Sequence, residues 1–123
     1  MKFVPLAMAM LLPALSGCTT APSEVPADPS YATDVQPIFN GKCITCHGGA
    51  SPSGGYSLTS RAGAVGGGSD TVPNVVPNNA ASSRLYRRIS GAETPRMPPG
   101  QAPLDTVMTA TVRNWIDKGA KDN

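Results

Sequence analysis

The sequence predicts one small, mostly α-helical domain built from a few short helices and long loops. Its 123 residues are enough for a single ordinary domain. It contains 13 glycines and 13 prolines, which is typical of a loop-rich chain but below the level of a disordered one. Apolar residues recur at helical spacing, and no stretch alternates apolar and polar residues for long enough to predict a sheet. The sequence has no internal repeat that would indicate a solenoid.

Residues 1–17 have the composition of an export signal. The apolar run is shorter than the roughly 20 residues that span a bilayer, which disfavours a membrane-spanning helix. Residues 15–18 (Leu-Ser-Gly-Cys) resemble the lipobox of bacterial lipoproteins, in which the cysteine is acylated; ordinary secretion is the alternative. We therefore predict a lipid on Cys18 and a flexible, lipid-anchored linker over 18–30. Thr19 after the cysteine is typical of sorting to the outer membrane.

The folded domain is expected over 31–123, and it begins with a helix. Thr33 or Asp34 can cap this helix, and Pro37 falls in or near the first turn, where it is tolerated. The helix runs toward Cys43. Its apolar side carries Val35, Ile38 and Phe39.

The middle of the domain is expected to be mostly loop. A short helical turn is predicted at about 60–65, within a region rich in glycine and serine. A second helix starts at Ser82 or Ser83, passes through Ile89 and stops at Gly91.

The last helix is the clearest. Asp105 or Thr106 can cap it, and Gly119 can end it. Apolar residues recur along one face at Met108, Val112 and Trp115, so we expect Trp115 in the core. The preceding segment 94–103 holds four prolines and is therefore expected to be irregular.

The strongest chemical signal is the pentapeptide 43–47, Cys-Ile-Thr-Cys-His. Two thiols one helical turn apart can add to the two vinyl groups on one edge of a porphyrin, and the adjacent imidazole then faces the iron. The pattern predicts one covalent haem c on Cys43 and Cys46, with His47 as an iron ligand.

Three other sites could use these cysteines. A structural zinc ion needs four Cys or His ligands, and outside the motif only Cys18 remains. A thioredoxin-like redox pair expects a βαβ context, which the Gly-rich segment after His47 does not provide. A structural disulfide is the third alternative. Three cysteines are an odd number for an exported chain, and two thioethers with one acylated thiol account for all of them.

The second axial ligand of the iron must come from another residue type, because His47 is the only histidine. Methionine is a common partner in cytochromes c. After the signal segment, only Met97 and Met108 remain, and Met108 shares the apolar face of the last helix. Met97 stands among prolines that restrict the backbone of its loop, so it is the expected ligand. An open sixth position is the alternative.

Segment 35–120 resembles a Planctomycete-type cytochrome c domain within the class I cytochromes c. The resemblance rests on residues 35–39 (VQPIF), 43–49 (CITCHGG), 83–89 (SRLYRRI), 96–100 (RMPPG) and 115–120 (WIDKGA). It implies a mostly helical, class I cytochrome c-like fold in which the first and last helices cross beside the haem. It also implies that His47 and Met97 lie on opposite faces of the porphyrin.

The expected function is single-electron transfer, not enzymatic catalysis, by a monomer on the periplasmic side of a bacterial membrane. Its partners are then redox proteins and, through the lipid on Cys18, the membrane. The net charge of +2 without a basic run disfavours nucleic acid. The alternatives are a haem c subunit of a larger redox complex and a ligand-binding or peroxidatic haem protein.

For several side chains near the motifs, the sequence allows more than one role. Arg84, Arg87 and Arg88 form a solvated helix face, a clamp for haem propionates or a docking patch for a redox partner. Tyr56 and Tyr86 either reach a propionate or cap the core.

Overall fold

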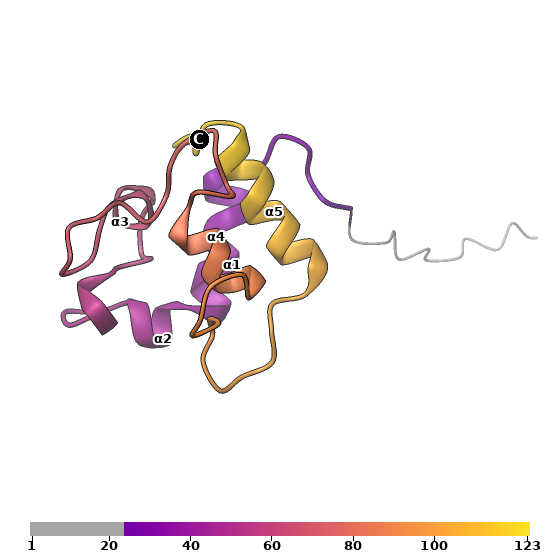
Figure 1. Cartoon of the computed structure of the whole chain (residues 1–123). Helices are drawn as coiled ribbons and strands as arrows, with labels where there is room; N and C mark the ends of the chain where they lie inside the picture. The colour runs from indigo at the N-terminus through magenta and orange to yellow at the C-terminus, as the bar shows by residue number, and fades with distance from the viewer. Residues whose placement is uncertain (1–23) are drawn as a thin grey trace, which may run out of the picture.

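The computed structural model describes residues 24–123, so the predicted signal segment and Cys18 lie outside the described residues. Within this part of the chain the structure is helical and has no strand. The helices are the π-helix η1 (Tyr31–Val35), α1 (Gln36–Lys42), α2 (Ile44–His47), the 3-10 helix η2 (Ser53–Gly55), α3 (Arg61–Val65), α4 (Arg84–Ser90) and α5 (Thr106–Asp117) (Figure 1). The predicted mostly α-helical fold class is confirmed. No helix in this part of the chain has both the length and the apolar character to cross a membrane.

The first helix begins earlier than the sequence predicted. Ser30, not Thr33 or Asp34, occupies its N-cap position and accepts a hydrogen bond from the backbone N–H of Thr33. The carboxylate of Asp34 accepts in return from the backbone N–H of Ser30 at 2.8 Å. This reciprocal arrangement works like a capping box and moves the start of the helix to Tyr31.

The last residues of the expected linker, 18–30, contact the domain. Pro29 is fully buried, and the backbone carbonyl of Pro26 accepts a hydrogen bond from the side chain of Asn114 at 2.9 Å. The hydroxyl of Ser30 donates to the carbonyl of Asn123 at 2.7 Å. The chain therefore contacts the domain from about Pro26 onward.

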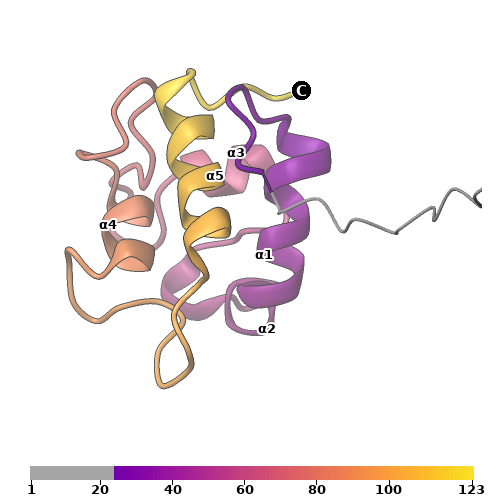
Figure 2. The same ribbon diagram turned by 90° about the vertical axis from the view of Figure 1, so that its right-hand side faces the viewer.

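The core lies between the two ends of the chain. α5 packs against both η1 and α4, and Figure 2 shows it between α1 and α4. The ring centroids of Tyr31 and Trp115 are 5.3 Å apart, and those of Tyr31 and Phe39 are 6.3 Å apart, with the rings tilted in both pairs. Trp115 is 1% exposed, which confirms its predicted place in the core. These contacts fit the expected crossing of the first and last helices.

The end of α4 and the start of α5 lie where the sequence predicted. α4 stops at Gly91, whose φ of 82° lies in the left-handed region that glycine adopts without strain. α5 starts at Asp105, whose carboxylate accepts from the backbone N–H of Met108 at 2.7 Å. Ser83 occupies the N-cap position of α4, but its buried hydroxyl does not cap the helix. The hydroxyl accepts a hydrogen bond from the backbone N–H of Val76 and donates one to the carbonyl of Asn79.

Candidate functional site

The four predicted haem-binding residues of the domain line a single cavity. Cys43, Cys46, His47 and Met97 all face a cavity of about 490 Å³. That volume falls within the range of roughly 300–1,000 Å³ that is usual for sites of small molecules and cofactors. Met108 does not line this cavity and packs against the core instead, as predicted. The fold thus brings a motif and a methionine together although about fifty residues separate them.

The Cys-Ile-Thr-Cys-His motif forms a short helix of its own, which the sequence analysis did not predict. Cys43 is both the C-cap of α1 and the N-cap of α2. Its φ and ψ are −125° and −36°. The backbone N–H of His47 donates to the carbonyl of Cys43 at 2.8 Å. This turn carries both thiols and the imidazole to the same cavity.

The imidazole of His47 is oriented by the backbone of Tyr56. Its Nδ1 lies 3.0 Å from the Tyr56 carbonyl oxygen, and because a carbonyl only accepts, Nδ1 must carry the proton. The tautomer that results leaves Nε2 free as a ligand atom for a metal. The sequence could not reveal this partner, because a backbone carbonyl leaves no trace in residue type.

Tyr56 is held in turn by α3. Its hydroxyl donates to the carbonyl of Ala64 at 2.6 Å, and burial raises the pKa of this phenol strongly. Its ring also meets the His47 ring edge-on, with centroids 5.6 Å apart. Because its hydroxyl is already used, Tyr56 braces the histidine and does not point a free donor at a ligand. Tyr86 does not line this cavity.

Two loops close the wall beside His47. The backbone N–H of Leu58 donates to the carbonyl of His47, and that of Ser69 donates to the carbonyl of Gly54, both at 2.8 Å. A Cβ atom at Gly68 would overlap the Gly54 carbonyl oxygen, so the loops can approach this closely only with glycine at position 68. The glycine run at 66–68 thus permits close contact between backbones.

Met97 reaches the cavity from a loop without regular secondary structure, as predicted. Its backbone N–H donates to the carbonyl of Arg88, in α4, at 2.9 Å. Its half-buried side chain packs against the core, and the neighbouring Pro98 is buried. The thioether is thus presented by a loop docked on α4.

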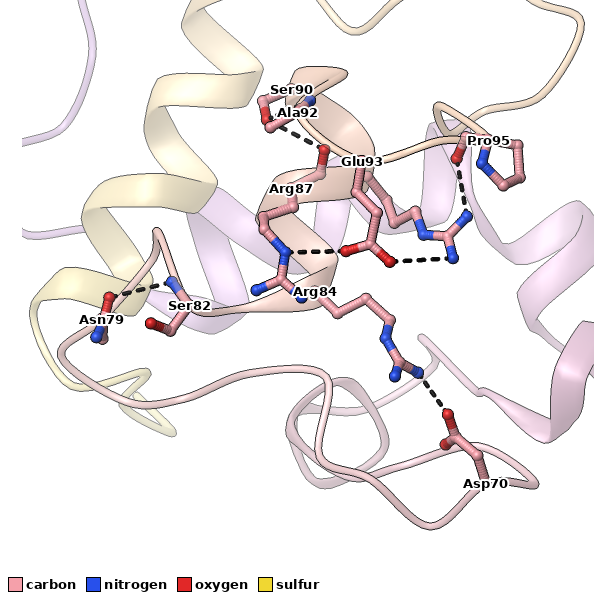
Figure 3. A network of polar contacts seen from close by, with 10 residues as sticks. Asp70, Asn79, Ser82, Arg84, Arg87, Ser90, Ala92, Glu93 and Pro95 are labelled. Atoms are coloured by element: carbon pink, nitrogen blue, oxygen red, sulfur yellow. Dashed lines mark hydrogen bonds and ion pairs between the residues drawn. The ribbon is translucent and has the colours of Figure 1, made fainter.

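The three arginines of α4 differ in what they contact. Arg84 and Arg88 line the cavity, whereas Arg87 does not. Arg84 pairs with Asp70 at 2.5 Å, and Arg87 pairs with Glu93 at 2.9 Å (Figure 3). Arg88 also contacts Glu93, at 3.2 Å. Each guanidinium therefore has a carboxylate partner, and the three arginine side chains are 25–35% exposed.

The chemistry of the cysteines disfavours the alternative sites. Cys43 and Cys46 are both free thiols. Burial, and then the neighbouring Cys46, raise the pKa of Cys43 to about 11, whereas a reactive redox cysteine has a lowered pKa. Within residues 24–123, no three His, Cys, Asp or Glu side chains are close enough together to hold a metal ion.

Comparison with known proteins identifies the domain. Residues 43–101 match a family model described as Planctomycete cytochrome C. No curated protein and no solved structure matches the chain. The family implies binding of haem c, and the residues fit that cofactor, because two thiols, a free imidazole nitrogen and a thioether surround one cavity of suitable size. The chain therefore carries a c-type cytochrome domain, which is similar to the Planctomycete cytochrome c family over residues 43–101.

Proposed function

We propose that this protein is a single-electron carrier with one covalent haem c. In this proposal Cys43 and Cys46 form the thioethers, and His47 and Met97 are the axial ligands. The observation that carries it is the convergence of all four side chains on one cavity of about 490 Å³. When bound, the haem would supply reversible one-electron chemistry, and the protein would set its potential and access.

The chain's own residues would control this site in two ways. The Tyr56 carbonyl holds the proton of His47 on Nδ1 and fixes the direction of Nε2. The loop of Met97 presents a thioether, a ligand that raises the potential relative to other ligand sets. With His47 and Met97 both holding the haem iron, the site would leave no free place for a substrate, which favours a carrier over an enzyme.

The polar groups of the cavity favour the same conclusion. A peroxidatic site needs a group that can move a proton beside the open iron position. The chain has no second histidine, and Asp70, an acidic residue of the cavity lining, is engaged by Arg84. Electron transfer requires no such group.

The location of the protein is part of the proposal. Acylation of Cys18 would anchor the domain on the periplasmic side of a membrane, most simply the outer membrane, where it would meet soluble or membrane-bound redox proteins as a monomer. The eight residue steps from Cys18 to Pro26, the first residue with a contact to α5, span at most roughly 30 Å. The electron carrier would therefore work close to the membrane surface.

Spectroscopy and mass spectrometry test the proposal. The full chain, exported by a host that attaches haem c, should show a visible spectrum that changes with dithionite. The haem should stay on the polypeptide in a pyridine haemochrome assay under denaturing conditions. A mass without a haem increment on the 43–47 peptide would overturn the proposal. A mature mass that begins at Cys18 and includes acyl chains tests the anchor separately.

A further inference from the structure

The loop that carries Met97 is fastened to α4 by two backbone hydrogen bonds. The N–H of Glu93 donates to the carbonyl of Arg87 at 3.0 Å, and that of Met97 donates to the carbonyl of Arg88 at 2.9 Å. Gly91 lies between the end of α4 and these two donors. It adopts the left-handed conformation, and the chain turns back along the helix there. These bonds fix the two ends of a five-residue segment, but they do not hold its middle.

The side chains of Glu93 and Arg88 add to this attachment. Its carboxylate accepts from Nε of Arg87 at 2.9 Å (Figure 3) and contacts Nη2 of Arg88 at 3.2 Å. Arg88 in turn donates from Nη1 to the carbonyl of Pro95 at 3.3 Å. One acidic side chain of the loop thus engages both arginines of the last turn of α4, and one of those arginines also holds the loop two residues before Met97.

The helix is a firm base for this attachment. Leu85 and Ile89 anchor α4 in the core, where they are 6% and 4% exposed. The other ion pair of α4, between Arg84 and Asp70, leads to a different loop. Of these ion pairs of α4, those that hold the Met97 loop therefore come from the last turn of the helix.

We infer that Glu93 is a positioning residue that keeps the Met97 loop closed on α4 through its pairs with Arg87 and Arg88. The inference rests on the proposed role of Met97 as an iron ligand. Without Glu93, the loop should spend a larger fraction of time away from the cavity. An external ligand that competes with Met97 then binds more tightly by the same factor, because its apparent affinity scales with the open fraction.

The experiment titrates imidazole into the oxidised, full-length holoprotein. Glu93→Gln removes the charge and keeps the shape, and we expect imidazole to bind about threefold to tenfold more tightly, as for the loss of partly exposed ion pairs. Glu93→Asp keeps the charge and should fall between Glu93→Gln and the wild type. The matched control is Asp28→Asn, which breaks an exposed pair with Lys121 outside the cavity and should change nothing.

A double-mutant cycle with Arg87 separates positioning from a general loss of stability. Arg87 does not line the cavity, so Arg87→Gln should act on imidazole affinity only through Glu93. Because Glu93 keeps its pair with Arg88, Arg87→Gln should have a smaller effect than Glu93→Gln, and the double variant should equal Glu93→Gln. Equal affinities in the wild type and Glu93→Gln, or additive effects in the cycle, would overturn the inference.

A parallel Met97→Ala variant tests the proposed ligand by itself. If it loses the methionine-to-iron absorption while Glu93→Gln binds imidazole like the wild type, the ligand assignment stands and the role of Glu93 fails. If Met97→Ala keeps the wild-type spectrum, the ligand assignment fails and the inference fails with it.

Discussion

The two sides of the cavity are held by different forces. On the His47 side, backbone hydrogen bonds and close backbone packing connect α2 to the loops around Tyr56 and Gly68. On the Met97 side, two backbone bonds are supplemented by half-exposed ion pairs between Glu93 and α4. Backbone bonds in a packed wall respond little to pH or salt, whereas exposed ion pairs respond to both. We therefore expect the histidine to be the fixed ligand and the methionine the labile one.

The largest expected effect comes from removing the haem that we propose lies in the cavity between the two sides. We expect Cys43→Ser with Cys46→Ser to carry no covalent haem and to lose most of its helical circular dichroism. Without the cofactor, the largely apolar walls of the cavity would face water, and a small domain has little other apolar burial to replace this lost area. Wild-type helix content in the variant would show that the protein completes its core without the cofactor.

Removal of the proposed labile ligand is expected to change the spectrum but leave the fold. Met97→Ala should abolish the methionine-to-iron absorption of the oxidised protein and lower its reduction potential, because the thioether favours the reduced iron. The control is Met108→Leu, a similar change in the core, which should alter neither quantity. If the methionine-to-iron absorption were lost in Met108→Leu and kept in Met97→Ala, the ligand would be Met108 and not Met97.

A change in the fixed wall should cost stability. In Gly68→Ala, the new methyl group overlaps the Gly54 carbonyl, and the two loops must separate. We expect the free energy of unfolding of the holoprotein to fall by about 1–3 kcal/mol in denaturant titrations, the usual cost of overpacking. Ser51→Ala, an exposed position in the same region, serves as the control and should unfold like the wild type. Equal midpoints for both variants would mean that the wall is not packed as described.

The smallest effect is a dependence on pH on the methionine side. The hydrogen bond from Arg87, followed by the charges of Arg88, Arg87 and Arg84, holds the pKa of Glu93 below its ordinary value of 4.5. A group with a lowered pKa stabilises the fold above its ordinary pKa and loses that contribution as the pH falls through the lowered value. The methionine-to-iron absorption of the wild type should therefore weaken in this acidic range.

Glu93→Gln provides the comparison for this titration. Because it has no carboxyl group at position 93, its absorption should lack the acidic step that the wild type shows. The same step in both proteins would assign it to another group.

The chemistry of this protein could be predicted from its sequence because it depends on residue types at short spacing. The 43–47 motif, the single histidine and the proline-flanked Met97 are local patterns, and so are the ends of α4 and α5 at Gly91 and Asp105. Each of these features needs only a few neighbouring residues, so no knowledge of the fold is required. The match to the cytochrome c family over residues 43–101 confirms the domain that those patterns indicated.

The tertiary structure alone decided how these groups are held. The Tyr56 carbonyl behind His47, the ion pairs of Glu93 with α4 and the contact of Pro26 with Asn114 all depend on groups that the fold brings together. A backbone carbonyl is the same in every residue, and an arginine side chain can reach several carboxylates. Which of them it meets is therefore settled only when the chain is packed.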